Sequence, residues 1–152
     1  MYIKEYLKQF NNKKIKLFVD MDGVLADYIF GSAKDYNLKR PLFSNIKKIK
    51  KISKNKNIQL FILSTARYSD GINQKHWWLD KYAPFFKKEN RIIISREANN
   101  MEESATLKAQ FFSTYPREDC VLILIDDDPK NLKKINALNE DVILLKDTVL
   151  VD

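Results

Sequence analysis

The sequence predicts an α/β protein with a central parallel five-stranded sheet and helices on both faces of that sheet. Five short apolar runs recur along the chain, and segments with helical periodicity separate most of them. Alternation of strands and helices is typical of parallel sheets, and near-continuous apolar strands indicate that both faces are covered. The length of 152 residues is that of one ordinary domain. We therefore expect a single domain over residues 1–152.

The individual elements follow from the apolar pattern in chain order. A short amphipathic helix is expected at residues 2–10, where aromatic and aliphatic residues recur at helical spacing. The runs with the length and β-branched character of strands are residues 15–19, 58–63, 92–94, 121–125 and 142–145. The helical patterns between them span residues 44–54, 73–82, 102–112 and 129–138. This order predicts a Rossmann-like three-layer sandwich.

The charge of the chain is strongly basic, with a formal net charge of +7. Positive potential concentrates anions, so nucleic acid is one partner that the composition allows. Much of the excess lies in the lysines of residues 47–56, which alternate with Ile46, Ile49 and Ile52 at helical spacing. A solvated helix face and a binding patch explain that pattern equally well. No apolar run approaches the ~20 residues that cross a bilayer, so we expect no membrane partner and a cytoplasmic location.

Acidic side chains follow two of the predicted strands. Asp20 and Asp22 come directly after residues 15–19, and Asp127 lies in the acidic run after residues 121–125. The carboxyl ends of parallel strands face one crevice, which is the usual ligand position in open α/β sheets. Carboxylates brought together there repel one another, and Mg²⁺, which prefers oxygen ligands, relieves that repulsion. Gly23 lets the backbone turn away at once and approach a ligand closely.

Four segments resemble the motifs of the haloacid dehalogenase superfamily of phosphohydrolases, in the order of that superfamily. Residues 18–27, FVDMDGVLAD, resemble the first motif, a hydrophobic strand followed by Asp-x-Asp-Gly. Residues 61–66, FILSTA, resemble the second, and Lys108 in TLKAQFF resembles the lysine of the third. Residues 122–131, LILIDDDPKN, resemble the fourth motif in its Asp-Asp-x-x-x-Asn variant. The resemblance spans about residues 16–138.

This resemblance implies a phosphatase that works through an aspartyl-phosphate intermediate. Asp20 is the implied nucleophile, and Asp22 is the implied general acid and then general base. The resemblance assigns the Ser64 hydroxyl, with Thr65 as the alternative, to bind the phosphoryl group. It also implies that Lys108 balances the charge of the nucleophile and the phosphoryl group.

The resemblance also implies a magnesium site. Its expected ligands are the Asp20 carboxylate, the main-chain carbonyl of Asp22 and the Asp127 carboxylate. Asp126 and Asn131 are expected to support this site. The ion would stabilise the charge that develops during phosphoryl transfer.

The segments DMDGVLAD, LSTA, LIDD and KHWWLDKY most resemble the 5'(3')-deoxyribonucleotidase-like branch of the superfamily. That branch implies a small phosphorylated substrate such as a nucleotide. A cap-like insert within about residues 26–45 leaves room for only a minimal cap, so larger substrates, including nucleic-acid ends, remain alternatives. A phosphomutase normally needs a larger cap. A non-catalytic receiver-like module is a further alternative, although such modules place the acidic pair before the phosphorylated aspartate.

Overall fold

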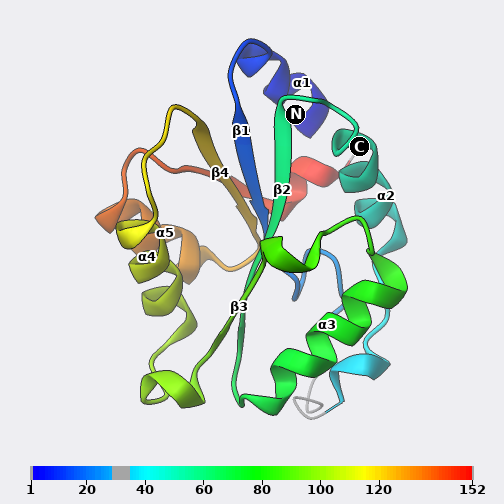
Figure 1. Ribbon diagram of the computed structural model, residues 1–152, viewed down its shortest axis with the longest axis vertical. Helices are drawn as coiled ribbons and strands as arrows, with labels where there is room; N and C mark the ends of the chain where they lie inside the picture. Colours follow the sequence, from blue (N-terminus) through cyan, green and yellow to red (C-terminus); the bar gives the residue numbers. More distant parts are fainter. Residues whose placement is uncertain (1, 29–34, 152) are drawn as a thin grey trace.

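The structure is a computed structural model that describes residues 2–28 and 35–151. Its strands form one sheet in the order β3-β2-β1-β4-β5, and every neighbouring pair is parallel. The strands are β1 (Ile15–Val19), β2 (Ile58–Ala66), β3 (Arg91–Ser95), β4 (Val121–Asp126) and β5 (Ile143–Lys146). The predicted five-stranded parallel sheet is therefore confirmed (Figure 1).

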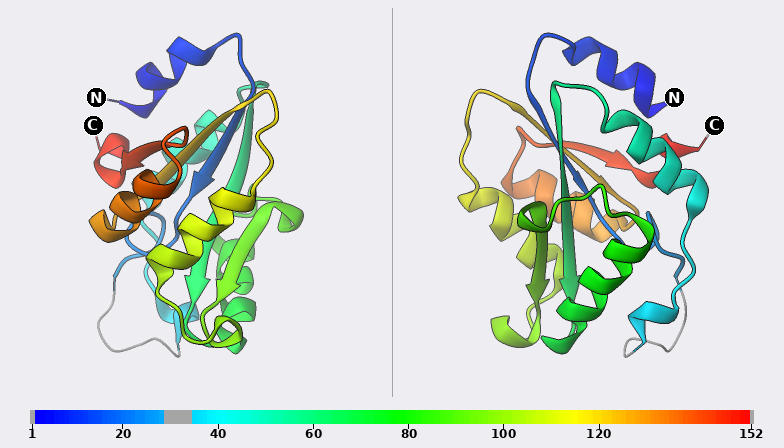
Figure 2. Two further views of the ribbon diagram at one scale, coloured as in Figure 1. Left: turned by 90° about the vertical axis from the view of Figure 1, so that its left-hand side faces the viewer. Right: turned by 45° about the vertical axis from the view of Figure 1, so that its right-hand side comes forward.

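Helices cover both faces of this sheet, which confirms the three-layer sandwich. The α-helices of the described residues are α1 (Ile3–Leu7), α2 (Phe43–Ile52), α3 (Asp70–Tyr82), α4 (Ser104–Thr114) and α5 (Pro129–Leu138). Short 3₁₀ helices span Lys8–Phe10, Tyr36–Leu38, Lys88–Asn90, Glu97–Asn99 and Asp147–Leu150. Helices α2 and α3 lie on one side of the sheet and α4 and α5 on the other (Figures 1 and 2). No helix in the described part of the chain is long and apolar enough to cross a membrane.

Two apolar cores result, one on each face of the sheet, because successive strand residues point to opposite faces. Leu17 and Val19 of β1 belong to the core beneath α2 and α3. Phe18 belongs to the core beneath α4 and α5. Its ring stacks on Phe61 with 4.8 Å between centroids and meets Phe112 edge-on at 5.2 Å. The same alternation decides which helix each polar residue at a strand end will face.

The structure moves several predicted boundaries by one to three residues. Strand β2 continues through Ala66, beyond the predicted end at residue 63, because Thr65 and Ala66 pair with β3. Helix α2 ends at Ile52 rather than residue 54, and α4 begins at Ser104 rather than residue 102. The extension of β2 places the predicted phosphate-binding hydroxyls, those of Ser64 and Thr65, inside a strand instead of a loop.

The predicted insert at residues 26–45 is only partly described, because residues 29–34 lie outside the described ranges. Among its described residues before α2, the regular element is the 3₁₀ helix Tyr36–Leu38. Isolated bridges join Ala26 to Asp22 and to Pro41, so the insert leaves and returns beside the end of β1.

The basic segment forms a solvated helix face. Ile46, Ile49 and Ile52 of α2 are buried, whereas Lys47 and Lys51 are exposed. The isoleucines lie at the three-residue spacing that puts them on one helical face. Packing therefore accounts for the spacing of the isoleucines.

Truncation of Phe18 tests the core beneath α4 and α5. We expect Phe18→Ala to lower the free energy of unfolding by about 3–5 kcal/mol, because a fully buried ring is replaced by a cavity. Urea denaturation measures the change, with Leu138→Ala as a control at a side chain that is 57% exposed. An equal loss in both variants would contradict the assigned packing.

Candidate active site

The polar residues at the strand ends face different helices, as strand alternation requires. Val19 is level with Ile62 of β2 and Ile125 of β4, so Asp20 lies beside Asp126 at the carboxyl edge. Asp20 and Asp126 both contact Lys108 of α4. On β2, Thr65 also faces α4, where its hydroxyl lies 2.6 Å from that of Ser104. Ser64 points to the opposite face and contacts α3.

Lys108 joins two carboxylates inside the protein. Its Nζ lies 3.0 Å from Asp20 Oδ1 and 2.7 Å from Asp126 Oδ2, and its side chain is only 2% exposed. Burial alone would lower the pKa of Lys108, but the two carboxylates outweigh it and raise that pKa. The lysine is therefore a fixed positive charge at the base of the site.

The Asp126 carboxylate accepts hydrogen bonds from three residues. Besides Lys108, its carboxylate accepts hydrogen bonds from the Asn131 side-chain amide at 3.1 and 3.3 Å and from the Asp128 main-chain N–H at 2.9 Å. Asp128 in turn caps α5, accepting from the Lys130 N–H at 2.9 Å, with Pro129 at the first helical position. This network fixes the direction in which the chain leaves β4.

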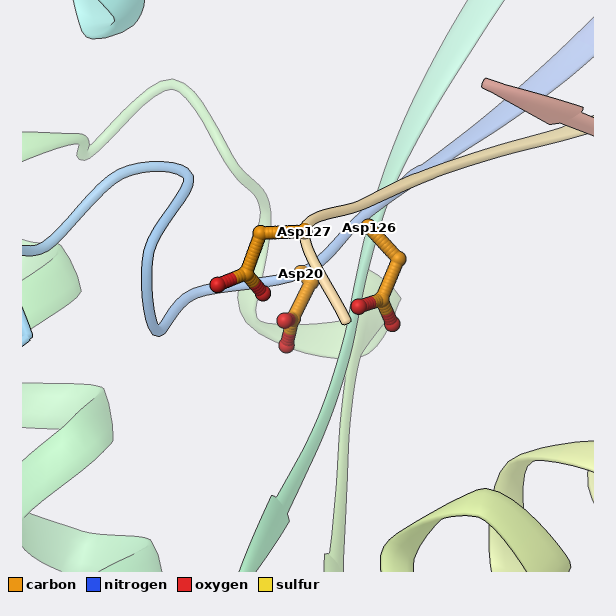
Figure 3. Close-up of side chains that lie close together, drawn as sticks. All are labelled: Asp20, Asp126 and Asp127. Carbon is orange, nitrogen blue, oxygen red and sulfur yellow. The ribbon is translucent and has the colours of Figure 1, made fainter. Parts of the chain in front are cut away.

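Asp127, the next residue, turns its carboxylate towards Asp20 and Gly23. Carboxylate oxygens of Asp20, Asp126 and Asp127 lie within 4.8 Å of one another, and Figure 3 shows the three side chains grouped at the strand ends. Gly23 has φ +79°, and a Cβ there would collide with the carboxylate of Asp127. Glycine is thus required both by the backbone conformation and by the close approach of Asp127.

Crowding of these carboxylates raises their pKa values. Burial raises the pKa of Asp20 to about 8; Lys108 opposes this shift, while the charges of Asp126 and Asp22 add to it. Burial and the neighbouring charge of Asp126 raise the pKa of Asp127 to about 6. A divalent cation fits this cluster, because it would replace the protons that the cluster otherwise retains and because carboxylate oxygens are ligands that Mg²⁺ prefers.

Asp22 has a different environment, clamped by two lysines. Lys75 of α3 lies 3.1 Å from Asp22 Oδ2, and Lys39 lies 2.6 Å from Oδ1. Burial would raise the pKa of Asp22, but the charges of Lys75 and Lys39 outweigh it and lower the pKa to about 2. Two aspartates separated by one residue therefore have pKa values shifted in opposite directions.

Sequence reasoning missed Lys75 and Lys39 as site residues. Lys75 is 4% exposed and donates to Ser64 Oγ at 2.6 Å and to the Thr65 carbonyl at 2.7 Å. Helical spacing could have identified Lys75, because it precedes Trp78 by three positions and therefore shares the buried face of α3. Lys39 has no such signal, because it follows a 3₁₀ helix and is held through its carbonyl, which accepts from Trp78 Nε1 at 2.9 Å.

Two adjoining cavities open beside these residues. The carboxylate cavity, of about 340 Å³, is lined by residues that include Asp20, Lys108, Asp127 and Asn131. The side cavity, of about 790 Å³, extends over the loop after β2. Both cavities are lined by Asp22, Tyr28, Thr65 and Ser104. Thr65, unlike Ser64, thus reaches the space in which a ligand would lie.

The fold resembles a known structure. The chain is similar to a chain in the structure of the Pnkp1/Rnl/Hen1 RNA repair complex, with a TM-score of 0.65 and 16% sequence identity. The similar region covers 89% of this chain and 43% of that one, so this chain spans less than half the length of its neighbour. No protein-family model matches, and no curated protein is similar in sequence. The likeness therefore shows the fold alone.

The raised pKa of Asp20 predicts a loss of stability as pH rises in the metal-free protein. An unfolded aspartate loses its proton near pH 3.9, whereas Asp20 in the native state keeps it to about pH 8. The native state then binds more protons between about pH 4 and 8, so this group's contribution to the free energy of unfolding falls across that window. In EDTA, we expect Asp20→Asn to lose less stability than the wild type over this range, measured by urea denaturation. The exposed Asp119→Asn is the control and should follow the wild type.

Added Mg²⁺ should reverse that loss. We expect Mg²⁺ to raise the melting temperature of the wild type more at about pH 8 than at about pH 5, because the ion competes with protons for Asp20 and Asp127. The shift should shrink in Asp127→Asn and persist in Asp119→Asn. Equal shifts in all three proteins would exclude binding at this cluster.

Proposed function

We propose that the chain is a metal-dependent phosphomonoester hydrolase in which Asp20 forms an aspartyl-phosphate intermediate. The observation that supports this most strongly is the pairing of buried Asp20 with Lys108 at 3.0 Å, beside the carboxylates of Asp126 and Asp127. Four motifs that resemble the haloacid dehalogenase superfamily supply these residues in that superfamily's order. The three-layer fold is compatible with this assignment.

In the first step, an Asp20 oxygen attacks phosphorus while the bond from phosphorus to the leaving oxygen breaks. Asp22 gives its proton to that oxygen, which departs as an alcohol. Asp22 is ionised in the free protein, and an arriving phosphoryl group would raise its pKa by adding negative charge and competing for Lys75. In the second step, Asp22 takes a proton from water, the water oxygen attacks phosphorus, and the Asp20 carboxylate is released with phosphate.

Magnesium is the cofactor that we propose, held by Asp20, Asp127 and the main-chain carbonyl of Asp22. When bound, the ion supplies positive charge that offsets the charge of the phosphoryl group. The Asp22 carboxylate is left free of the ion in this arrangement, because it is engaged by Lys39 and Lys75. Asp126 and Asn131 support the site by orienting the turn that carries Asp127.

Thr65 is the residue that we assign to bind the phosphoryl group. Its side chain lines both cavities, whereas Ser64 is fully buried and accepts a hydrogen bond from Lys75. Ser64, the first choice from sequence, would then act by holding Lys75 against Asp22 rather than by touching the phosphoryl group.

The substrate class that the sequence supports is a nucleotide or another small phosphate ester. Phosphorylated nucleic-acid ends are the second candidate from the sequence, and the neighbour's place in an RNA repair complex supports them. A receiver-like module is the non-catalytic alternative, and it differs in outcome: it would keep the phosphoryl group on an aspartate, whereas a phosphatase releases phosphate repeatedly.

Replacement of the nucleophile tests the covalent mechanism. We expect Asp20→Asn to lower Mg²⁺-dependent phosphate release from p-nitrophenyl phosphate and deoxynucleoside monophosphates by at least about a thousandfold, because Asp20 is the group that forms the acyl phosphate in the proposed mechanism. Mass spectrometry of acid-quenched wild type should detect one added phosphoryl group on the peptide that carries Asp20. Circular dichroism confirms folding, and Asp119→Asn should retain wild-type turnover. Full turnover in Asp20→Asn would refute the mechanism.

The two hydroxyls of β2 are separated by a second comparison. We expect Thr65→Val to lower kcat/KM by about 10- to 100-fold, the usual cost of losing a hydrogen bond to a charged group. Ser64→Ala should chiefly alter the pH profile, since its hydroxyl contacts Lys75. Thr114→Val, at an exposed position near the end of α4, is the matched control. A larger loss of kcat/KM in Ser64→Ala than in Thr65→Val would restore Ser64 as the binding hydroxyl.

A further inference from the structure

The side cavity points to the kind of leaving group that the site accepts. We propose that it binds the single-stranded end of a nucleic acid, placing the terminal phosphate at Asp20 and the following nucleotide along the loop after β2. This inference rests on the proposed phosphatase function and adds its substrate class. The starting observation is size: the side cavity is about 790 Å³, more than twice the carboxylate cavity that it joins at Asp22, Tyr28, Thr65 and Ser104.

The walls of the side cavity carry aromatic groups suited to stacking. Tyr28 and Tyr68 line it from different segments and are 66% and 40% exposed. The Arg67 guanidinium lies 5.5 Å from the centroid of the Tyr68 ring. Proteins that bind single strands combine aromatic rings, on which bases stack, with cations that follow the backbone. The Arg67–Tyr68 pair supplies both at the far end of the cavity.

Arg67 is available to a ligand, because Asp70 and Glu97, which line the cavity as Asp22 does, form no ion pair with it in the described part of the chain. Lys39 and Lys75 are paired with Asp22. The Arg96 guanidinium donates to the main-chain carbonyls of Met101 and Glu102. Among the described residues, the Arg67 side chain makes no hydrogen bond or ion pair, and its guanidinium lies beside the Tyr68 ring.

The position of Arg67 favours a strand over a mononucleotide. Arg67 and Tyr68 line the side cavity but not the carboxylate cavity. A mononucleotide has one phosphate, which the reaction places at Asp20, so it offers no second anion to Arg67. The next phosphate of a polynucleotide does. Chain polarity is left to experiment, because either end presents a terminal phosphate followed by a phosphodiester.

The basic face of α2 does not explain strand binding in this arrangement. Lys51 precedes β2, whose first residue, Ile58, pairs with Ile15 at the amino edge of the sheet. The carboxylates lie at the opposite edge, where β1 and β4 end. Lys51 is exposed and lines a separate cavity formed with α1, so it provides a matched control for the loss of one positive charge.

The test compares substrates that share a terminal group. We would measure kcat/KM of the full chain with Mg²⁺ on thymidine pentanucleotides that carry a 3'- or 5'-phosphate, on the matching thymidine monophosphates, and on p-nitrophenyl phosphate. For one of the two polarities, the kcat/KM of the pentanucleotide should exceed that of the matching monophosphate by at least about tenfold, since a stacked base contributes about that factor or more. Arg67→Gln and Tyr68→Leu should each lower the ratio of pentanucleotide to p-nitrophenyl phosphate kcat/KM by about tenfold.

Salt dependence identifies the phosphate contact. Arg67→Gln should reduce the slope of log kcat/KM for the pentanucleotide against log salt by about 0.7, whereas Lys51→Gln should leave the slope and the ratio unchanged. Equal kcat/KM for pentanucleotide and monophosphate, or equal effects of Arg67→Gln and Lys51→Gln, would overturn the strand subsite. If none of these substrates releases phosphate, the proposed function fails. Fluorescence anisotropy with a labelled pentanucleotide then decides the subsite by itself, because binding must weaken in Arg67→Gln and not in Lys51→Gln.

Discussion

The contact of Lys108 with Asp20 and Asp126 is the interaction on which the site depends. Two carboxyl groups under 10% exposed at neighbouring strand ends repel each other strongly in a medium of low polarity when both are ionised. The ammonium group between them, at 3.0 and 2.7 Å, offsets that repulsion without filling the space in front of Asp20. Removal of Lys108 would leave uncompensated buried charge, which costs far more than the pair itself contributes to stability. The sheet can therefore carry buried acidic residues at its carboxyl edge because α4 places Lys108 between them.

The turn that follows β1 gives Asp20 and Asp22 different partners, because alternation along a continuing strand would point residues two positions apart to the same face. Asp20 faces α4 and Lys108, whereas Asp22, beyond the end of β1, reaches Lys75 on the opposite layer. Burial and neighbouring carboxylates raise the pKa of Asp20 in the metal-free protein, while Lys75 and Lys39 lower that of Asp22. In the metal-free protein these shifts run opposite to the proposed roles, because Asp20 keeps its proton and Asp22 is ionised. A cation at Asp20 would lower its pKa, and a phosphoryl group beside Asp22 would raise that of Asp22. The central sheet thus keeps a candidate nucleophile and a candidate acid–base group close together but electrostatically distinct.

The sequence was sufficient for the sheet and for the acidic strand ends, because both follow from local patterns of apolar and polar residues. The choice between Ser64 and Thr65 required the register of β2 against β1. Once Val19 is known to be level with Ile62, alternation places Thr65 on the α4 face and Ser64 on the α3 face. Lys39 was beyond reach for a different reason: its position depends on the path of the insert and on a tertiary hydrogen bond to Trp78. Neither the path of the insert nor that hydrogen bond can be predicted from the periodicity of the sequence.

The net charge of +7 gives little information about ligands until the cations are placed. The exposed lysines of α2 repeat around a buried isoleucine stripe, and the last of them lie near the amino edge of the sheet, away from the carboxylates. Lys39, Lys75 and Lys108 lie inside the site, but their charge is matched by the acids that they contact. Arg67 has no acid partner among the described residues and borders the cavity. A cation contributes to recognition when its charge is left unmatched at a surface that the ligand reaches, so one arginine can determine specificity more than a whole basic helix.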